Sequence, residues 1–490
     1  MAPNALTSSG TVDEVEFCWN TDNLLTKLFI NNEYVDSKSG KYLTVFNPKD
    51  GTLVSDKVML ADGNDVDGAV RAAEIAFPAW RKTPPNVRRD MLLNLATLIL
   101  KHTETLSALS RLTLGGPISA VGAMEVVFAA EVLRYFAGWT DKLAGETYPE
   151  EDGFFKFVRQ EPLGVTAGII PWNAPVGSIC VKAAPALATG NCIIPKLSEK
   201  TPFAGLAMGT LIKAAGFPPG VFQVLSGDGS TGALISSHMR IRKVSFTGST
   251  ATGKKIQEAA ARSNLKRVTL ELGGKSPALV FDDADLENAV NWCVNAVIMN
   301  TGQACFAATR VYVQSGIYDA FVSRYNALIE KKTKMVGNPD DPATMIGPLV
   351  DESQFNRVLG FMDRGSSQGR LLVGGGKLYN KGFFVAPTVF PDVPEDPEIM
   401  RQEIFGPVAV INKFETEEEA LSLANNTNYG LMAGIFTKDI TRAIQFSSEL
   451  DSGMVGINAA PRRAAWRGNG VHAVRSYTEP KTVFINMNVA

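Results

Sequence analysis

From residue 164 onward, the chain alternates apolar segments of strand length with turns and stretches of helical periodicity. Strand-like segments occur at residues 165–170, 191–195, 221–225 and 242–246, separated by turns and helix-like stretches. Strands that alternate with helices predict βαβ units and a mainly parallel sheet. In such sheets, ligands bind at the carboxyl ends of the strands. The pattern therefore predicts an α/β fold with a ligand site at one edge of the sheet.

A second α/β series follows residue 271. Its expected strands and helices lie at residues 277–282, 286–299, 310–313, 318–334, 384–389 and 408–413. The 490 residues, of which 45% are hydrophobic, are enough for at least two domains. Because no linker rich in proline or serine separates the two series, we expect two closely packed domains with a cleft between them.

Charge and cysteine content exclude several kinds of partner. The 48 basic and 50 acidic residues are interspersed, which argues against a nucleic-acid surface or a polybasic membrane anchor. The five cysteines form no Cys-x-x-Cys pair, which argues against a disulfide framework or a bound metal. Residues 1–25 have no signal-peptide pattern, and no later apolar run has the length of a membrane span. We therefore expect a cytoplasmic protein whose partner is a small molecule.

Cys305 stands in an unusual setting for a cysteine. Residues 300–310 read Asn-Thr-Gly-Gln-Ala-Cys-Phe-Ala-Ala-Thr-Arg, a segment of small residues and amides after an apolar helical run. Backbone N–H groups and amides beside a thiol can raise its thiolate fraction above that of a free cysteine, whose pKa is about 8.5. A cysteine in an apolar segment is also commonly an inert small hydrophobe. From this segment alone, both interpretations stay open.

Two further side chains have the chemistry that a nucleophile needs nearby. Asn173 lies between Pro171 and Pro175, whose fixed φ angles would hold its amide rigidly as an oxyanion donor. Glu271 ends an apolar strand beside two glycines, where a raised pKa would suit a general base. Each also has a plainer interpretation, as a turn asparagine and as a salt-bridged glutamate at a strand end.

Two glycine-containing turns are candidates for binding a phosphate. Residues 227–232 match the dinucleotide fingerprint, but the acidic residue expected about 20 positions later is missing, so a turn without ligand fits equally well. Residues 246–254 are the better candidate. There Gly248 permits close backbone approach, and Ser249 can cap a helix whose N–H groups attract phosphate. A helix cap with a basic first turn is the alternative.

Together, these segments resemble the NAD(P)-dependent aldehyde dehydrogenase superfamily over residues 29–483. Five motifs occur in the order and approximate spacing of that family: Pro171-Trp172-Asn173, Phe246-Thr247-Gly248-Ser249-Thr250, Leu270-Glu271-Leu272-Gly273-Gly274-Lys275, Gly302-Gln303-Ala304-Cys305 and Glu403-Ile404-Phe405-Gly406-Pro407. Five separate motifs in one order are hard to attribute to chance. The resemblance favours the nucleophile over the inert cysteine at position 305.

The resemblance implies a fold of three parts. A Rossmann-type NAD-binding domain would comprise residues 26–138 and 160–270, and an α/β catalytic domain would comprise residues 271–475. A small β oligomerisation arm would be formed by residues 139–159 and 476–490. Residues 1–25 would form a mobile tail before the first domain. Because an arm of this kind pairs with a neighbouring subunit, we expect a homodimer or a homotetramer.

The resemblance also implies catalytic roles for four residues. Cys305 would add to the aldehyde carbon, and the Asn173 amide with the Cys305 N–H would hold the oxyanion. Glu271 would activate the water that hydrolyses the thioester to a carboxylic acid, and Lys182 would help to relay the proton. The implied enzyme is an NAD-dependent aldehyde dehydrogenase.

By the same resemblance, the cofactor NAD would be bound by Trp172, Lys196, Glu199, Gly248, Ser249, Glu403 and Phe405. Lys196 and Glu199 follow a strand where the adenosine ribose would lie, although a lone Lys and Glu are ordinarily solvated charges. A carboxylate that accepts hydrogen bonds from ribose hydroxyls would repel a 2′-phosphate. Glu199 therefore predicts NAD rather than NADP.

The residues after Asn173 suggest the size of the substrate. Ala174, Gly177, Ser178 and Val181 are small, in a pattern similar to family members that oxidise aromatic aldehydes, and Phe306 follows the nucleophile. We expect a roomy apolar pocket for a bulky aromatic or long-chain aldehyde.

The chain departs from the family at residues 459–470, where the aromatic-glycine signature is lost and the segment is shorter than in relatives. This segment normally walls the substrate entrance. The departure raises the alternative of a catalytically impaired homologue with a binding or structural role. A third interpretation, capture of the thioester by an acceptor such as coenzyme A, is less favoured because Glu271 is intact.

Overall fold

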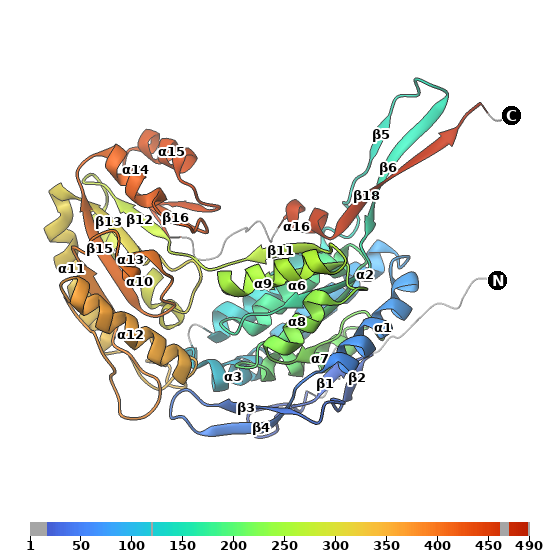
Figure 1. Cartoon of the computed structure of the whole chain (residues 1–490), viewed down its shortest axis with the longest axis horizontal. Helices are drawn as coiled ribbons and strands as arrows, with labels where there is room; N and C mark the ends of the chain where they lie inside the picture. The colour runs from blue at the N-terminus through green and yellow to red at the C-terminus, as the bar shows by residue number, and fades with distance from the viewer. Residues whose placement is uncertain (1–16, 119–120, 461–469, 489–490) are drawn as a thin grey trace.

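A five-stranded parallel sheet forms the centre of the larger of two lobes (Figure 1). The computed structural model describes residues 17–118, 121–460 and 470–488. In the order β11-β10-β7-β8-β9, the strands are Arg267–Glu271, Lys243–Thr247, Val165–Ile169, Cys192–Leu197 and Leu225–Ser226. The chain first extends the sheet from β7 toward β9 and then returns to the other side of β7 with β10. The carboxyl ends of β7 and β10 therefore form a topological switch point, where a ligand is expected.

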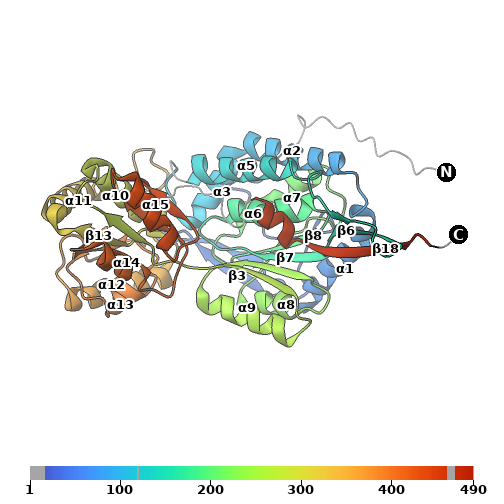
Figure 2. The same ribbon diagram turned by 90° about the horizontal axis from the view of Figure 1, so that it is seen from above.

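Helices cover both faces of this sheet (Figure 2). On one face lie α6 (Pro175–Ala188) and α7 (Phe203–Ala214), backed by α2 (Pro85–Lys101), α3 (Thr103–Leu114) and α5 (Val127–Ala137). The other face is covered by α1 (Gly63–Trp80), α8 (Gly229–Ser237) and α9 (Thr250–Arg262). Because the sheet is buried on both faces, β8 is a continuous buried segment rather than an alternating one.

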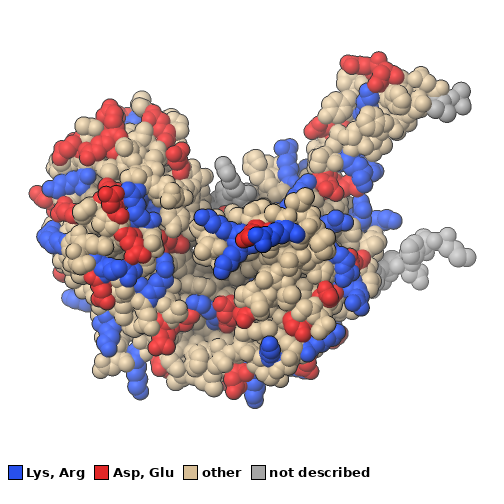
Figure 3. Space-filling model, viewed as in Figure 1, with Lys and Arg blue, Asp and Glu red and all other residues tan. Residues whose placement is uncertain are grey.

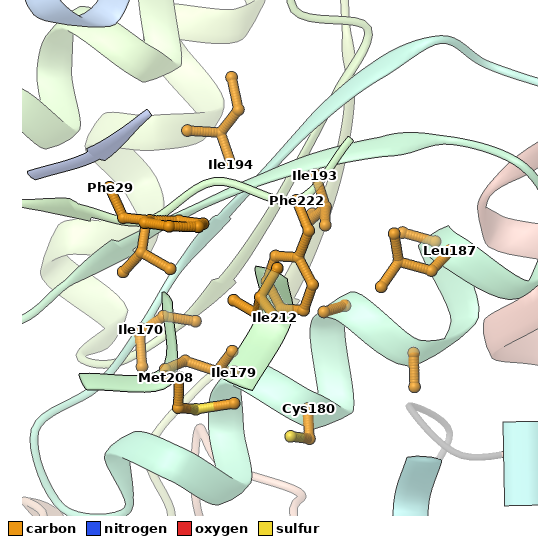
Figure 4. Packing of buried hydrophobic residues seen from close by; sticks show 14 of the residues in the cluster. Phe29, Ile170, Ile179, Cys180, Leu187, Ile193, Ile194, Met208, Ile212 and Phe222 are labelled. Carbon is orange, nitrogen blue, oxygen red and sulfur yellow. The ribbon is translucent and has the colours of Figure 1, made fainter. Parts of the chain in front are cut away.

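The core of the larger lobe lies between β8 and the helices α6 and α7. Ile179 and Cys180 from α6, Met208 from α7 and Ile193 from β8 are fully buried and belong to one hydrophobic cluster (Figure 4). Burial raises the pKa of the Cys180 thiol far above its ordinary range, so this cysteine behaves as a small hydrophobe. The packing fixes α6 against the carboxyl end of β7.

The smaller lobe contains a six-stranded parallel sheet in the order β14-β15-β13-β12-β16-β17. These strands are Thr388–Pro391, Val408–Phe414, Arg310–Gln314, Pro277–Val280, Ala433–Phe436 and Val455–Ile457. Its helices are α10 (Leu286–Ile298), α11 (Tyr318–Thr333), α12 (Glu352–Gln368), α13 (Glu398–Arg401), α14 (Glu417–Asn425) and α15 (Ile440–Glu449). The strand predicted at residues 384–389 begins only after Pro387, which lacks the N–H that a ladder needs.

A three-stranded antiparallel sheet projects from the larger lobe as an arm (Figure 1). It consists of β5 (Glu146–Tyr148), β6 (Phe154–Pro162) and β18 (Thr478–Asn486), and the short α16 (Val471–Ser476) precedes β18. Two hairpins lie near the N-terminus, β1 with β2 (Leu28–Ile30, Glu33–Val35) and β3 with β4 (Tyr42–Phe46, Leu53–Met59). The domain boundaries themselves stay predictions.

Residues 17–25, part of the segment expected to be a tail, contact the larger lobe. The Trp19 indole donates a hydrogen bond to the Thr210 hydroxyl at 2.9 Å, and Leu25 is buried. Residues 1–16 lie outside the described part of the chain. On the face shown in Figure 3, basic and acidic side chains are interspersed over both lobes. Within the described ranges, no helix has the length and apolar character needed to cross a membrane.

Candidate active site

Cys305 lies in a tight loop between α10 and β13. Asn300 and Thr301 adopt positive φ angles of 49° and 59°, and Gly302 follows at 71°. A Cβ atom on Gly302 would lie 2.2 Å from the backbone carbon of Gly406, so only glycine fits this close approach. The loop is therefore wedged against residue 406, and Cys305 is held at a defined place between the lobes.

Asn173 is joined to the Cys305 loop by hydrogen bonds. Its side-chain Nδ2 donates to the carbonyl oxygen of Gln303 at 3.0 Å. In return, the Asn300 side chain donates to the carbonyl oxygens of Asn173 and Gln303, each at 3.2 Å. Asn173 and Cys305 line the same cavity of about 180 Å³. The structure thus brings the expected amide donor and the thiol together.

Glu271, at the end of β11, and Lys182, on α6, influence each other's charge. Burial raises the pKa of Glu271, and the Lys182 ammonium opposes that rise. Burial lowers the pKa of Lys182 to about 8, against the attraction of Glu271. The Lys182 Nζ donates to the Thr247 hydroxyl at 2.7 Å and to the Ser245 hydroxyl at 3.3 Å. Because the buried Oε1 of Glu271 has no hydrogen-bond partner, it can accept a proton from water.

The Cys305 thiol is less acidic than its neighbouring amides suggested. Burial raises its pKa to about 12, and the charges of Glu271 and Glu403 act in the same direction. The N–H groups of Cys305 and Phe306 lower the pKa, but desolvation outweighs them. The prediction of an enhanced thiolate fraction is therefore wrong for the protein without ligands. The thiol needs a base, and Glu271, whose charge acts most strongly on it, is the candidate.

A second and larger space, a cleft of about 1070 Å³, adjoins the cavity at Cys305. It lies at the carboxyl ends of β7 and β10, the switch point of the five-stranded sheet. The residues predicted to bind NAD all line this cleft: Trp172, Lys196, Glu199, Gly248, Ser249, Glu403 and Phe405. Cys305 lines both spaces, so it stands where they meet.

The donor set of the cleft fits a dinucleotide. Lys196 is buried at the end of β8, and its Nζ lies 3.8 Å from Glu199 Oε2. The Ser249 hydroxyl caps α9 by accepting from the Thr252 N–H, so the positive end of that helix faces the cleft. The carboxylates of Glu199 and Glu403 can each accept hydrogen bonds from one ribose, and the N-terminus of α9 can bind the pyrophosphate.

Glu403 and Phe405 are held at the end of the cleft near Cys305. Glu403 Oε1 accepts from the Gly274 N–H at 3.1 Å, and a Cβ atom on Gly273 would lie 2.1 Å from its Oε2. Burial raises the pKa of Glu403 to about 7. The Phe405 ring meets the Trp172 ring edge-on, with centroids 5.1 Å apart. Close packing thus sets the position of both side chains.

The comparisons with known proteins agree with this geometry. The model of the aldehyde dehydrogenase family matches residues 34–473. Aldehyde dehydrogenase, cytosolic 1, of Macroscelides proboscideus is 44% identical over 501 residues and covers 99% of each chain. The chain belongs to the aldehyde dehydrogenase family. Retinal dehydrogenase 2 of Taeniopygia guttata is 45% identical over 478 residues, covering 94% of this chain and 92% of that protein.

Solved aldehyde dehydrogenases share the fold. An NAD+ complex of the enzyme from Bacillus cereus has a TM-score of 0.91 and 38% identity, covering 94% of this chain and 97% of that one. The indole-3-acetaldehyde dehydrogenase of P. syringae, in complex with NAD+ and IAA, has a TM-score of 0.91 and 35% identity at the same coverage. The predicted fold class, an aldehyde dehydrogenase-like α/β fold, is confirmed.

Sequence reasoning missed part of the wall of this aldehyde dehydrogenase's cavity. Ala174, Gly177, Ser178, Val181 and Phe306 line it as expected. Further lining comes from residues that carried no motif: Leu114, Met124, Glu125, Phe128 and Met299. In the cleft, the discounted turn at residues 227–232 contributes Gly229 and Gly232, and Arg357 donates to the Glu403 carbonyl at 2.7 Å. The roles of individual site residues stay predictions.

The departure at residues 459–470 lies mostly outside the described residues, which exclude 461–469. Ala460 is buried beside the smaller lobe's sheet, and the chain resumes at Gly470 before α16. Among the residues that the structure does describe, no cluster of three or more His, Cys, Asp or Glu is placed to hold a metal ion.

Proposed function

We propose that this aldehyde dehydrogenase oxidises bulky aromatic or long-chain aldehydes to carboxylic acids with NAD, through a thioester on Cys305. One observation carries the proposal: Cys305 stands where an apolar cavity meets a dinucleotide-sized cleft. A nucleophile at that junction can hold the aldehyde carbon on one side and face the hydride acceptor on the other.

The first step is addition of the thiol to the aldehyde carbon. Glu271 takes the thiol proton, the sulfur forms a bond with the carbon, and the carbonyl electron pair moves to the oxygen. The Asn173 Nδ2 and the Cys305 N–H stabilise that oxyanion. Asn173 is suited to this role because two hydrogen bonds tie it to the Cys305 loop. The Gln303 carbonyl that now accepts from Asn173 competes with the substrate oxygen for the same donor.

The second step hydrolyses the thioester. After hydride leaves the carbon and the thiol proton has left Glu271 by way of Lys182, the carboxylate accepts a proton from water, whose oxygen attacks the acyl carbon and releases the Cys305 sulfur. The positive charge of Lys182 stabilises the carboxylate form of Glu271. The Lys182 ammonium donates hydrogen bonds to the hydroxyls of Thr247 and Ser245. We assign it the passage of the proton away from the site.

NAD is the cofactor, and when bound it supplies the acceptor for the hydride. Glu199 and Lys196 would hold the adenosine ribose, Gly248 and Ser249 the pyrophosphate, and Glu403 the nicotinamide ribose. Trp172 and Phe405 would pack around the nicotinamide. The carboxylate of Glu199 favours NAD over NADP, because it would repel a 2′-phosphate.

The cavity supports the proposed substrate class. Small residues on α6 (Gly177, Ser178 and Val181) leave room beside the apolar side chains of Phe128 and Met299. Two relatives are named for bulky aldehydes, retinal dehydrogenase 2 and an indole-3-acetaldehyde dehydrogenase. An aromatic or long-chain aldehyde fits an enclosed apolar wall better than a small hydrated one.

A substrate panel read by NADH absorbance tests this function. We expect aromatic and long-chain aldehydes to have higher kcat/KM than acetaldehyde, and Cys305→Ala to lower turnover on the order of 10⁴-fold or more. The matched control is Cys18→Ala, which changes an exposed cysteine. A preference for short aliphatic aldehydes would reject the substrate class. Full activity of Cys305→Ala would reject the mechanism.

The remaining alternatives are separated by the same assay. The impaired homologue with a structural role is disfavoured by the family match, and it predicts NAD binding without turnover. Capture by coenzyme A predicts product only when that thiol is added. We further propose a cytoplasmic homodimer or homotetramer that pairs through the arm, whose strands expose Phe155, Phe484 and Ile485. Relatives named cytosolic support that location.

A further inference from the structure

Helix α6 begins without a cap from its own sequence. Its N-cap residue is Ala174, which has no side-chain oxygen, and Pro175 is the first helical residue. The N–H groups of the first turn therefore need acceptors from elsewhere. This end of the helix matters, because Asn173 directly precedes the cap and Lys182 lies two turns further on.

Glu125 supplies the missing acceptor from a different segment. It lies in the π-helical turn Val121–Val126 and is buried, with only 8% of its surface exposed. Its Oε1 accepts from the Val176 N–H at 2.6 Å and from the Gly177 N–H at 3.3 Å. These are the second and third helical residues, whose N–H groups an N-cap side chain normally satisfies. Glu125 is thus a cap provided by tertiary structure.

The N–H groups at the start of α6 are the main groups that stabilise the Glu125 carboxylate. The Ser110 hydroxyl on α3 and the Cys180 thiol on α6 are the other groups that interact with its charge. Burial keeps that thiol neutral, and Oε2 of Glu125 makes no hydrogen bond. Burial raises the pKa of Glu125 to about 7, while the two N–H groups lower it. The charge of the carboxylate and the order of the helix end therefore depend on each other.

We propose that Glu125 is a positioning residue for the oxyanion site: its carboxylate anchors the first turn of α6 and thereby holds Asn173 against the Cys305 loop. Two restraints then act on Asn173. Hydrogen bonds to residues 300 and 303 fix its side chain and carbonyl, and the anchored helix fixes the backbone that follows it. A displacement of about 1 Å of such a donor can cost on the order of 10²-fold in rate. The inference rests on the proposed function of Asn173.

Kinetics test the coupling between the two residues. We expect Glu125→Ala to lower kcat on the order of 10²-fold with little change in the NAD dissociation constant. Glu125→Gln keeps an acceptor oxygen without charge, so it should lose less. In an Asn173→Ala background, Glu125→Ala should have almost no further effect, because the group that it positions is gone. Thr113→Val is the control for local repacking and should stay close to wild type, because the Thr113 hydroxyl lies buried on α3 without a hydrogen-bond partner.

Hydrogen exchange gives a readout that does not need activity. The Val176 and Gly177 amides should exchange faster in Glu125→Ala than in the wild type. If Glu125→Ala does not fold, Glu125→Gln takes its place in the comparison. In the wild type, protection corrected for intrinsic rates should be higher at pH 8, where Glu125 is charged, than at pH 6. That difference should vanish in Glu125→Gln. Unchanged protection, or additive kinetic losses with Asn173→Ala, would overturn the inference. An inactive wild type would count against the proposed function alone, since exchange still tests the cap.

Discussion

The two spaces that meet at Cys305 are built in different ways. The cofactor cleft lies at the carboxyl ends of β7 and β10, and much of its lining comes from turns that follow strands directly, with further residues from α8, α9 and α12. The substrate cavity lies between α6, the Cys305 loop and the segment around Met124 and Phe128. The first is a property of the sheet's topology, whereas the second depends on side chains from elements that are far apart in the sequence.

The two spaces therefore place different requirements on the sequence. In the cleft, backbone position decides the chemistry, so glycines and helix ends matter more than side-chain size. In the cavity, side-chain volume and a few buried polar groups decide which aldehyde enters. A change in one space should therefore leave the other largely intact, and variants can be chosen to break or sharpen that independence.

Asn173→Ala should have the largest one-sided effect. Removing one oxyanion donor typically lowers kcat about 10²–10³-fold. Asn173 lines both spaces, but its amide donates to the Cys305 loop and its loss leaves the other cleft residues in place, so NAD affinity should stay near wild type. Steady-state kinetics and an NAD titration measure the two quantities. An equal loss of NAD affinity would show that the two spaces are not independent.

Ser178→Leu should narrow the cavity from the α6 side. For an aromatic aldehyde with two rings, we expect kcat/KM to fall about 10–100-fold, a typical cost of steric mismatch in an apolar pocket. A short aliphatic aldehyde should be affected little, and Ser178→Ala is the matched control that adds no volume. Equal losses for both aldehydes would mean that position 178 does not select by size.

Glu199→Gln should act on the cleft alone. Loss of a charged acceptor for ribose hydroxyls should lower kcat/KM for NAD by about tenfold and narrow the preference over NADP. The KM for the aldehyde should not change. Glu258→Gln, on the exposed face of α9, is the control for removing a carboxylate. A wild-type preference for NADP would contradict the role of Glu199.

Lys182→Met should produce the smallest change, a shift in the pH profile. Burial raises the pKa of Glu271. As the pH falls, this base therefore becomes protonated and inactive at a higher pH than an ordinary carboxyl group would. The Lys182 charge lowers that pKa, so its removal should move the acid limb of kcat to higher pH. An unmoved or lowered limb would mean that another group sets it.

How far the sequence predicts the site follows from the same comparison. The residues of the cleft were predictable because strand ends and glycine turns leave a local signature, as at Gly248 and Ser249. The α6 side of the cavity was predictable because Ala174 to Val181 follow a motif directly. Glu125 and Phe128 were not, since only the packing of α5 and its π-helical start against α6 brings them to the cavity.

The acidity of Cys305 was misjudged for a related reason. Neighbouring amides are visible in a sequence, but the depth of burial and the approach of Glu271 and Glu403 depend on the assembled lobes. Short strands such as β17 likewise depend on their pairing partners. The residues that meet at the site could therefore be inferred from the sequence, and their electrostatic setting could not.

The most direct test of the central claim is the intact mass of the wild-type enzyme, quenched with acid during its first turnover with NAD and an aromatic aldehyde. Acid stops hydrolysis and leaves the acyl group on the enzyme. The expected gain is the mass of the aldehyde less two hydrogen atoms, mapped by peptide analysis to Cys305 and absent without NAD. A protein with no adduct, or with one on the exposed Cys18, would contradict a thioester at the junction of the cavity and the cleft.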